Sequence, residues 1–121
     1  MNPHTDGPIE ELTPHQVAQL LRERRIILVD VREAEEFAVQ RIPGALLCPL
    51  STLDATMLPP DTDRQLVFHC GSGKRSVSAA RARLAAGAAR AAHLTGGIAA
   101  WKADGLAVIP LDPSTGKPAT T

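Results

Sequence analysis

The chain has 121 residues and a formal net charge of zero, with 13 basic and 13 acidic side chains. This length suits one domain with its own hydrophobic core, and the balanced charge gives no reason to expect a nucleic acid or an anionic membrane surface as a partner. No apolar run is long enough for a membrane-spanning helix, and the first residues lack the pattern of a secretory signal. Two cysteines without a disulfide framework favour the cytoplasm.

Composition divides the chain into three stretches. Residues 1–8 are polar, with prolines and a glycine, and are expected to be a loose lead-in. Residues 9–109 carry the apolar segments of a folded domain. Residues 110–121 are rich in Pro, Ser, Thr and Gly, so we predict a disordered tail.

The first part of the domain predicts a strand, a helix and a second strand. An edge strand is expected at 9–12. Thr13 as the N-cap, Pro14 at the first helical position and Gln16 closing a capping box mark the start of a helix. The continuous apolar run 26–29 is typical of a strand covered on both faces.

Charged residues follow that second strand. Asp30 and Arg32 could line a site or form a structural ion pair, and we favour the structural role. Glu36 lies four residues beyond Arg32, which makes it the expected ion-pair partner within this segment. A short helix is predicted over 33–39, with Phe37 turned to the core.

The middle of the chain predicts a turn, a strand and a helix. Residues 42–44, Ile-Pro-Gly, supply turn chemistry, and a strand is expected at 45–48. Residues 51–54 form a second capping-box pattern and predict a helix that stops before Pro59.

The stretch 67–76, Val-Phe-His-Cys-Gly-Ser-Gly-Lys-Arg-Ser, carries the strongest chemical signal. The apolar run 66–68 predicts a buried strand that ends at Cys70, and a helical pattern starts at Ser76. A thiol at this junction is expected to be exposed at the carboxyl edge of a sheet, where α/β folds bind ligands. His69 should point to the opposite face, which makes it a poor general base.

The residues after Cys70 favour thiolate over thiol. Gly71 and Gly73 allow backbone N–H groups to point inward as a nest for negative charge. The start of the helix, with Lys74 and Arg75, adds positive charge. Inert packing is the alternative for a lone cysteine, but it does not explain these neighbours. We therefore predict a reactive cysteine that meets something anionic.

Two similar motifs can be excluded. A Walker loop needs glycine where Phe68 stands and Ser or Thr where Arg75 stands. A metal site needs clustered ligands, but Cys48, Cys70 and the four histidines are scattered along the chain. Neither a metal nor a cofactor is expected.

The remaining segments predict a long helix, followed by a short one. The alanine-rich run 76–86 is strongly helical, with Val77, Ala80 and Leu84 on one face and Gly87 at its end.

The segment 88–94 has too little β-branched content to predict a strand by itself. Two glycines at 96–97 open a final helix that ends at Gly105. Ile98 and Trp101 share one face of it, and Trp101 is expected to anchor the core. Alternating elements of these lengths predict a three-layer α/β/α domain with a small parallel sheet.

Four segments, in order, resemble those of a single-domain rhodanese, a sulfurtransferase. They are Asp30-Val31-Arg32-Glu33 with Glu36-Phe37, Ile42-Pro43-Gly44-Ala45, the loop Cys70 to Ser76, and Gly96-Gly97 to Trp101. The resemblance covers residues from about 9 to about 106 and implies the same three-layer fold. It also implies a strand at 91–94 and architectural roles for Asp30 and Arg32. Residues 40–41, Gln-Arg, depart from the Gly-His that is usual in the family.

The resemblance implies a two-step sulfur transfer. The Cys70 thiolate would attack the outer sulfur of an anionic donor, become a persulfide, and pass the sulfur to cyanide, a thiol or an acceptor protein. The donor would be bound by the loop residues Gly71, Ser72, Gly73, Lys74, Arg75 and Ser76. The Gly-Ser-Gly that follows Cys70 is similar to the loop of mercaptopyruvate sulfurtransferases. The cations Lys74 and Arg75 better suit thiosulfate, and we favour thiosulfate as the donor.

Two alternatives stay open, and the oligomeric state is not indicated. A cysteine phosphatase or arsenate-reductase-like enzyme would space its residues Cys-x5-Arg, whereas Cys70-x4-Arg75 is one residue shorter and better suits a sulfur atom. A persulfide carrier or binding module would have the same loop. Cys48 could resolve a persulfide, although inert packing is favoured.

Overall fold

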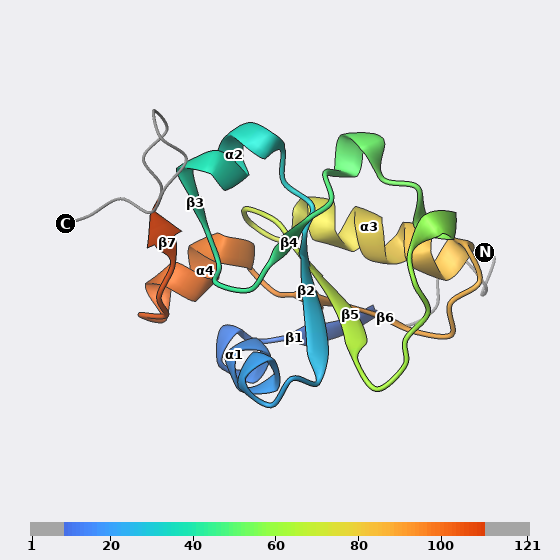
Figure 1. The fold of residues 1–121 in the computed structure, drawn as a ribbon, viewed down its shortest axis with the longest axis horizontal. Coiled ribbons are helices and arrows are strands. Elements are labelled where there is room, and N and C mark those ends of the chain that lie inside the picture. Colours follow the sequence, from blue (N-terminus) through green and yellow to red (C-terminus); the bar gives the residue numbers. More distant parts are fainter. Residues whose placement is uncertain (1–8, 111–121) are drawn as a thin grey trace.

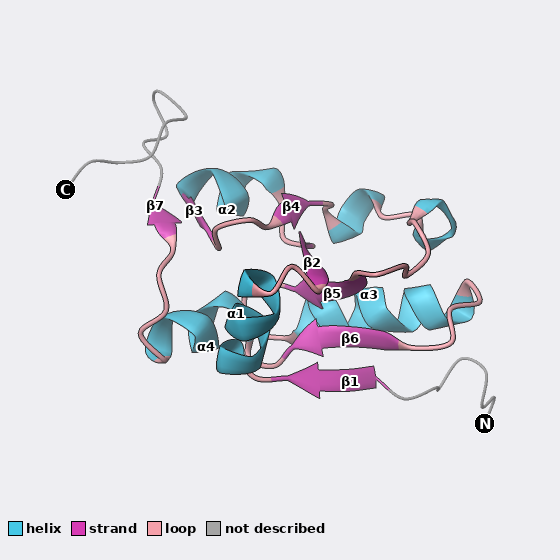
Figure 2. Cartoon of the chain, turned by 60° about the horizontal axis from the view of Figure 1, so that its bottom comes forward, coloured by secondary structure: helices cyan, strands magenta, loops and turns pink. Residues whose placement is uncertain are grey.

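The computed structural model of the protein describes residues 9–110, which are built around a five-stranded sheet in the order β1-β6-β5-β2-β4 (Figure 1). The strands are β1 (Ile9–Leu12), β2 (Ile26–Asp30), β4 (Leu46–Leu47), β5 (Gln65–His69) and β6 (Ala91–Leu94). All neighbours in this sheet are parallel. In Figure 2, β1 and β6 lie side by side and point the same way. The predicted α/β class with a parallel sheet is confirmed.

Helices cover both faces of the sheet. They are α1 (Pro14–Arg22), α2 (Ala34–Val39), α3 (Lys74–Ala85) and α4 (Gly97–Ala103), with short 3-10 helices η1 (Leu50–Thr52) and η2 (Ala55–Met57). Val17 of α1 and Trp101 of α4 pack in a core on one face, and Phe68 packs with Leu84 of α3 on the other. This is the predicted three-layer arrangement. Within residues 9–110, no helix is long and apolar enough to cross a membrane.

Two local sequence signals are confirmed. Thr13 Oγ1 accepts the Gln16 N–H at 3.2 Å, and Gln16 Oε1 accepts the Thr13 N–H at 2.9 Å, which closes the capping box before Pro14. At the end of α3, Gly87 has a φ of 109° and donates its N–H to the Leu84 carbonyl at 3.0 Å. This is the glycine-terminated helix end that the sequence predicts for α3.

The start and the buried face of α3 differ from the prediction. The helix begins at Lys74 instead of Ser76. Val77 is only half-buried, whereas Arg83 is buried. Arg83 tolerates burial because its Nη2 donates to Asp61 Oδ1 at 3.0 Å. Apolar spacing alone did not reveal this charged core position.

The α-helix predicted to start at residues 51–54 is wrong, because the chain forms only the two short 3-10 helices η1 and η2 there. Ser51 does not cap a helix, since its hydroxyl donates to Glu33 Oε1 at 2.7 Å. Asp54 caps only η2, accepting from the Thr56 N–H at 3.0 Å. The local pattern assigned the Ser51 hydroxyl to a helix cap, but this hydroxyl instead bonds to a residue that is distant in sequence.

Two further predictions for the middle of the chain are corrected. The strand expected at 45–48 is reduced to β4, because only Leu46 and Leu47 pair with β2. Phe37 is half-buried and belongs to neither core. The centroid of its ring instead lies 4.0 Å from the Arg41 guanidinium carbon, a cation–π contact at the end of α2.

A second, two-stranded sheet pairs β3 (Gln40–Arg41) with β7 (Ile109–Pro110), antiparallel. The sequence placed Pro110 in the disordered tail, but it belongs to this sheet. The rest of the predicted tail, 111–121, and the lead-in, 1–8, lie outside the described residues.

Candidate active site

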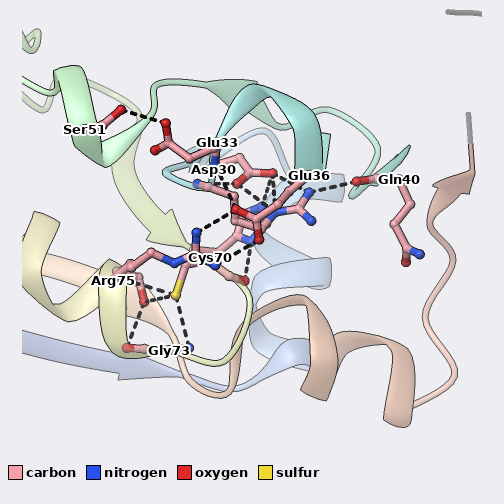
Figure 3. A network of polar contacts seen from close by, with 11 residues as sticks. Asp30, Glu33, Glu36, Gln40, Ser51, Cys70, Gly73 and Arg75 are labelled. Carbon is pink, nitrogen blue, oxygen red and sulfur yellow. Dashed lines mark hydrogen bonds and ion pairs between the residues drawn. The ribbon is translucent and has the colours of Figure 1, made fainter. Parts of the chain in front are cut away.

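The carboxyl end of β5 delivers Cys70 to the sheet edge, where a tight loop encloses it (Figure 3). Gly73, with a φ of 107°, is the residue that turns the loop into the first turn of α3. Cys70 is only 1% exposed, so the prediction of an exposed thiol is wrong. The loop folds over the sulfur instead of presenting it on the surface.

Three hydrogen-bonding groups, one from the loop and two from the first turn of α3, converge on the Cys70 sulfur. Sγ accepts the Gly73 N–H at 3.1 Å and the Ser76 N–H at 3.3 Å. The Ser76 hydroxyl oxygen lies 3.6 Å from the same sulfur. We call Cys70, Gly73 and Ser76 the thiol cradle. It matches the inward-facing nest that the glycine pattern predicts, but Ser76 contributes more than its place in the sequence suggests.

The electrostatics of the thiol cradle favour the thiolate. Burial acts to raise the pKa of the Cys70 thiol, because a charge is less stable away from water. Hydrogen bonds from the Ser76 hydroxyl and from the N–H groups of Ser76, Gly73 and Ser72 outweigh this effect, so the pKa lies below its ordinary value. The thiolate is the nucleophilic form of cysteine.

Arg75 forms a bidentate pair with Glu36 of α2, with N–O distances of 2.6 and 3.0 Å (Figure 3). The expected pair between Arg32 and Glu36 is therefore wrong. Hydrogen bonding to Arg75 lowers the pKa of Glu36, so this carboxylate stays charged beside the loop. The guanidinium lies against Gly71, where a Cβ would come 3.1 Å from Nη2.

Arg32 binds Asp30 instead, in a buried structural pair. Arg32 Nη2 lies 2.8 Å from Asp30 Oδ2 and also donates to the Gln40 carbonyl at 2.8 Å. His69 Nε2 is 3.3 Å from the same Asp30 oxygen, on the opposite face of β5 from Cys70, as the strand alternation predicts. These contacts tie the ends of β2 and β5 to β3.

The other predicted site residues lie around the rim. The side chains of Ser72 and Lys74 are exposed. Cys48 is half-buried and packs against the same apolar core as Cys70, so inert packing stays the prediction. Among residues 9–110, no group of three or more His, Cys, Asp or Glu side chains is placed to hold a metal ion.

A hollow of about 370 Å³ opens beside the loop, between α2 and α4. Its lining includes Glu36 and Gln40 on one side and Ala99 and Lys102 on the other. The hollow adjoins the loop, because the Ala99 N–H donates to the Gly71 carbonyl at 3.1 Å, and the exposed Lys102 lies in its lining. Lys102 is not among the site residues that the sequence predicts.

The first turn of α4 donates two backbone hydrogen bonds to the loop that follows β5. Ile98 N–H donates to the Cys70 carbonyl at 2.9 Å, and Ala99 N–H donates to the Gly71 carbonyl at 3.1 Å. This close approach depends on Gly97, which has a φ of 61°. A Cβ there would collide with the Cys70 carbonyl oxygen and lie 2.7 Å from the Gly71 carbonyl carbon and oxygen.

Gly97→Ala is therefore expected to lower the free energy of unfolding by about 2–5 kcal/mol, through a left-handed backbone and overpacking against the loop. Gly105→Ala is the matched control, because Gly105 also has a positive φ, of 78°, but its Cβ would meet nothing within 4 Å. It should show only the backbone cost, about 1–2 kcal/mol. Equal losses in urea unfolding would contradict the proposed contact between Gly97 and the loop.

Sequence reasoning missed His93 of β6. This residue is 3% exposed, and its Nδ1 lies 2.9 Å from Ser76 Oγ. His93 enters the sequence analysis only among the scattered histidines that argue against a metal site, and the composition of 88–94 does not predict β6 by itself. The available signal was alternation, because Ala91 and His93 share the strand face that α3 covers.

The fold and the thiol cradle are those of a small α/β domain with a buried thiol at the carboxyl edge of its parallel sheet. The chain belongs to the rhodanese family, since the model of the rhodanese-like domain matches residues 13–104. The resemblance seen in the sequence is thereby confirmed.

Three relatives are similar in sequence. A sulfurtransferase of Allochromatium vinosum is 33% identical, over 84% of this chain and 95% of its own. Thiosulfate sulfurtransferase GlpE of Pseudomonas savastanoi is 33% identical, over 74% of this chain and 85% of its own. The uncharacterized protein slr1261 of Synechocystis is 38% identical over 81% of this chain, and the match spans only 55% of that longer relative.

The fold is also that of a solved protein of unknown function from Rhodopseudomonas palustris, described as a possible tyrosine phosphatase. The two share 28% identity with a TM-score of 0.73, over 86% of this chain and 87% of the other. By its family and its relatives, the chain is a rhodanese-like protein related to small sulfurtransferases.

Proposed function

We propose that the protein is a thiosulfate sulfurtransferase in which Cys70 carries the sulfur as a persulfide. The observation that carries the proposal is the thiol cradle, in which two backbone N–H groups point at Sγ from 3.1 and 3.3 Å. These donors stabilise negative charge on the cysteine sulfur.

In the first step, the Cys70 thiolate attacks the outer sulfur of thiosulfate. A sulfur–sulfur bond forms to Cys70, and sulfite leaves with the electron pair of the bond that breaks. In the second step, cyanide or a thiol attacks the outer sulfur of the persulfide, and Cys70 leaves as the thiolate. The charges balance in both steps, as in a two-step covalent transfer.

Thiosulfate is favoured over mercaptopyruvate because of the cations around the loop. Lys74 is exposed at the start of α3, and Lys102 lines the neighbouring hollow. Arg75 contributes less, because Glu36 already occupies its guanidinium. A small dianion suits these two lysines, and a relative is named thiosulfate sulfurtransferase.

The arrangement of Arg75 counts against a phosphatase. A phosphatase loop would need this guanidinium free to bind a phosphoryl group, but both its terminal nitrogens are bonded to Glu36.

The two free cysteines fit a reducing compartment, so we propose that the protein acts in the cytoplasm.

The test is the intact mass of the reduced protein after brief exposure to thiosulfate, followed by cyanide. We expect a gain of one sulfur atom, its loss to cyanide, and the same behaviour in Cys48→Ser. Mercaptopyruvate is run in parallel to compare the donors. A chain that takes sulfur from neither donor contradicts the proposal.

Two further results would point elsewhere. Stable loading without repeated turnover to cyanide would indicate a persulfide carrier that serves an acceptor protein. Hydrolysis of p-nitrophenyl phosphate that disappears with Cys70→Ser would indicate a phosphatase.

A further inference from the structure

A row of polar side chains leads away from the Cys70 sulfur. Sγ lies 3.6 Å from Ser76 Oγ, which lies 2.9 Å from His93 Nδ1. On the far side of the ring, His93 Nε2 lies 3.7 Å from Glu11 Oε1 of β1. The thiol, the hydroxyl and the imidazole are all buried, whereas the Glu11 side chain is 70% exposed. Cysteine and histidine are thus connected through one hydroxyl.

The parallel sheet explains why these groups meet. His93 is in register with Phe68 of β5 and with Glu11 of β1. Register partners share a sheet face, and Phe68 packs in the core on the α3 side. His93 therefore points toward α3, where Ser76 occupies the first turn.

The charged groups around the chain are few. The β5 neighbour of His93, Phe68, is uncharged, and Glu11 is the carboxylate that faces the ring from β1. Near the sulfur, the Arg75 guanidinium is already paired with Glu36.

The contacts of His93 select one tautomer of the neutral ring. Among the described residues, the buried Nε2 has no hydrogen-bond partner, and the group that faces it is the Glu11 carboxylate. A proton on Nε2 suits this neighbour, which leaves Nδ1 as a bare acceptor. The Ser76 hydroxyl can donate to the Gly73 carbonyl at 3.2 Å, but Nδ1 is closer, at 2.9 Å.

We propose that His93 is a positioning residue for Cys70, and that Ser76 relays a proton between the thiol and the imidazole. In the thiol form, the Cys70 S–H donates to Ser76 Oγ, and the Ser76 hydroxyl donates to His93 Nδ1. On ionisation, the sulfur proton moves to Oγ while the hydroxyl proton moves to Nδ1.

The result is a thiolate, a neutral serine and an imidazolium. The Ser76 hydroxyl now donates to the Cys70 sulfur, and His93 Nδ1–H donates to Ser76 Oγ. Atoms and charge are conserved, and no reagent is consumed. The Glu11 carboxylate faces the new positive charge, although its exposure makes this a weak attraction. The relay rests on the proposed function only in that it prepares the nucleophile of that reaction.

The first experiment follows the rate at which iodoacetamide alkylates Cys70 as the pH is varied, in a Cys48→Ser background that leaves a single thiol. Iodoacetamide is small, uncharged and needs no sulfur donor. Because Cys70 is buried, the pH at which the rate is half-maximal, rather than the rate itself, reports the ionisation of the thiol. His93→Asn keeps a group that can bond to Ser76 but cannot take up a proton. We expect its rate at neutral pH to fall about tenfold, as for a shift of one unit in the pH profile.

Ser76→Ala should lower the rate at least as much, and the double variant no further than Ser76→Ala alone. His15→Asn is the matched control, since His15 is an exposed histidine on α1, and it should keep the wild-type profile. A folded His93→Asn variant with the wild-type profile overturns the relay. Failure of sulfur loading with the expected alkylation profile would instead count against the proposed function alone.

A second measurement does not depend on the folding of His93→Asn. The ring nitrogens of His93 are followed by ¹⁵N NMR during pH titration of the Cys48→Ser background and of the same background with Cys70→Ser. In the relay the ring takes up a proton when the thiol loses one, so the ¹⁵N signals of His93 should follow the ionisation of Cys70 and should lose that step with Cys70→Ser. Identical titration curves in the two proteins would show that the two groups are not coupled and would overturn the proposal.

Discussion

Replacing Cys70 with serine is expected to remove sulfur loading entirely while leaving the fold intact. An alcohol at this position stays protonated at neutral pH and cannot hold a sulfur atom as a persulfide. Serine is close in size, and the N–H groups of Gly73 and Ser76 that now bond to sulfur can bond to oxygen. We therefore expect the free energy of unfolding to change by less than about 1 kcal/mol.

The measurement pairs intact mass after thiosulfate with urea unfolding. Cys48→Ser is the matched control, because it removes the other free thiol and should load sulfur as the wild type does. If Cys70→Ser still takes up sulfur and Cys48→Ser does not, the nucleophile is Cys48 and not Cys70. Loss of sulfur together with loss of the fold would mean that the thiol cradle tolerates only sulfur, contrary to the stability argument.

Elements that depend on neighbouring residues could be predicted from the sequence. The capping box of Thr13 and Gln16 and the glycine end of α3 are formed by residues a few positions apart, and both are present. The loop after Cys70 is also local, since its glycines decide where the N–H groups point. This is why the sequence could predict inward-facing N–H groups around Cys70, although it did not predict the contacts that Ser76 makes with the sulfur.

Contacts between distant residues could not be predicted in this way. The Ser51 hydroxyl is taken by Glu33, 18 residues away, so a capping pattern produced no helix. Glu36 pairs with Arg75 at a separation of 39 residues, although Arg32 stands four residues from it. Helical spacing favours the nearer pair, but Arg32 is drawn instead to Asp30.

Site residues contributed by other strands were missed for the same reason. His93 reaches Ser76 only because β6 lies beside β5, a pairing that the sequence of β6 does not indicate by itself. The burial of Cys70 is likewise a property of the folded loop, supported by Ile98 and Ala99 of α4. The family resemblance supplied the strand, but not these contacts.

Asp30→Asn is expected to cost about 3–5 kcal/mol of the free energy of unfolding, because it leaves the buried Arg32 guanidinium without its countercharge. The two side chains are 0% and 5% exposed and share a bidentate contact, with Asp30 Oδ2 2.8 Å from Arg32 Nη2. Glu36→Gln is the matched control, since it breaks a bidentate arginine pair whose side chains are 37% and 38% exposed. Solvent screens that pair, so its loss should cost less than about 1 kcal/mol.

The pH dependence provides an independent check on Asp30. Burial acts to raise the pKa of this carboxyl, but hydrogen bonds from His69 and Arg32 outweigh it and hold the pKa well below its usual range. A carboxyl with a depressed folded-state pKa contributes stability above its unfolded-state pKa, about 3.9, and loses that contribution as the pH falls toward the folded-state value. Urea unfolding of the wild type should therefore show stability falling with acid below about pH 4, and Asp30→Asn should show a shallower fall. If Asp30→Asn instead matches Glu36→Gln at neutral pH and keeps the acid slope of the wild type, the buried pair does not stabilise the fold.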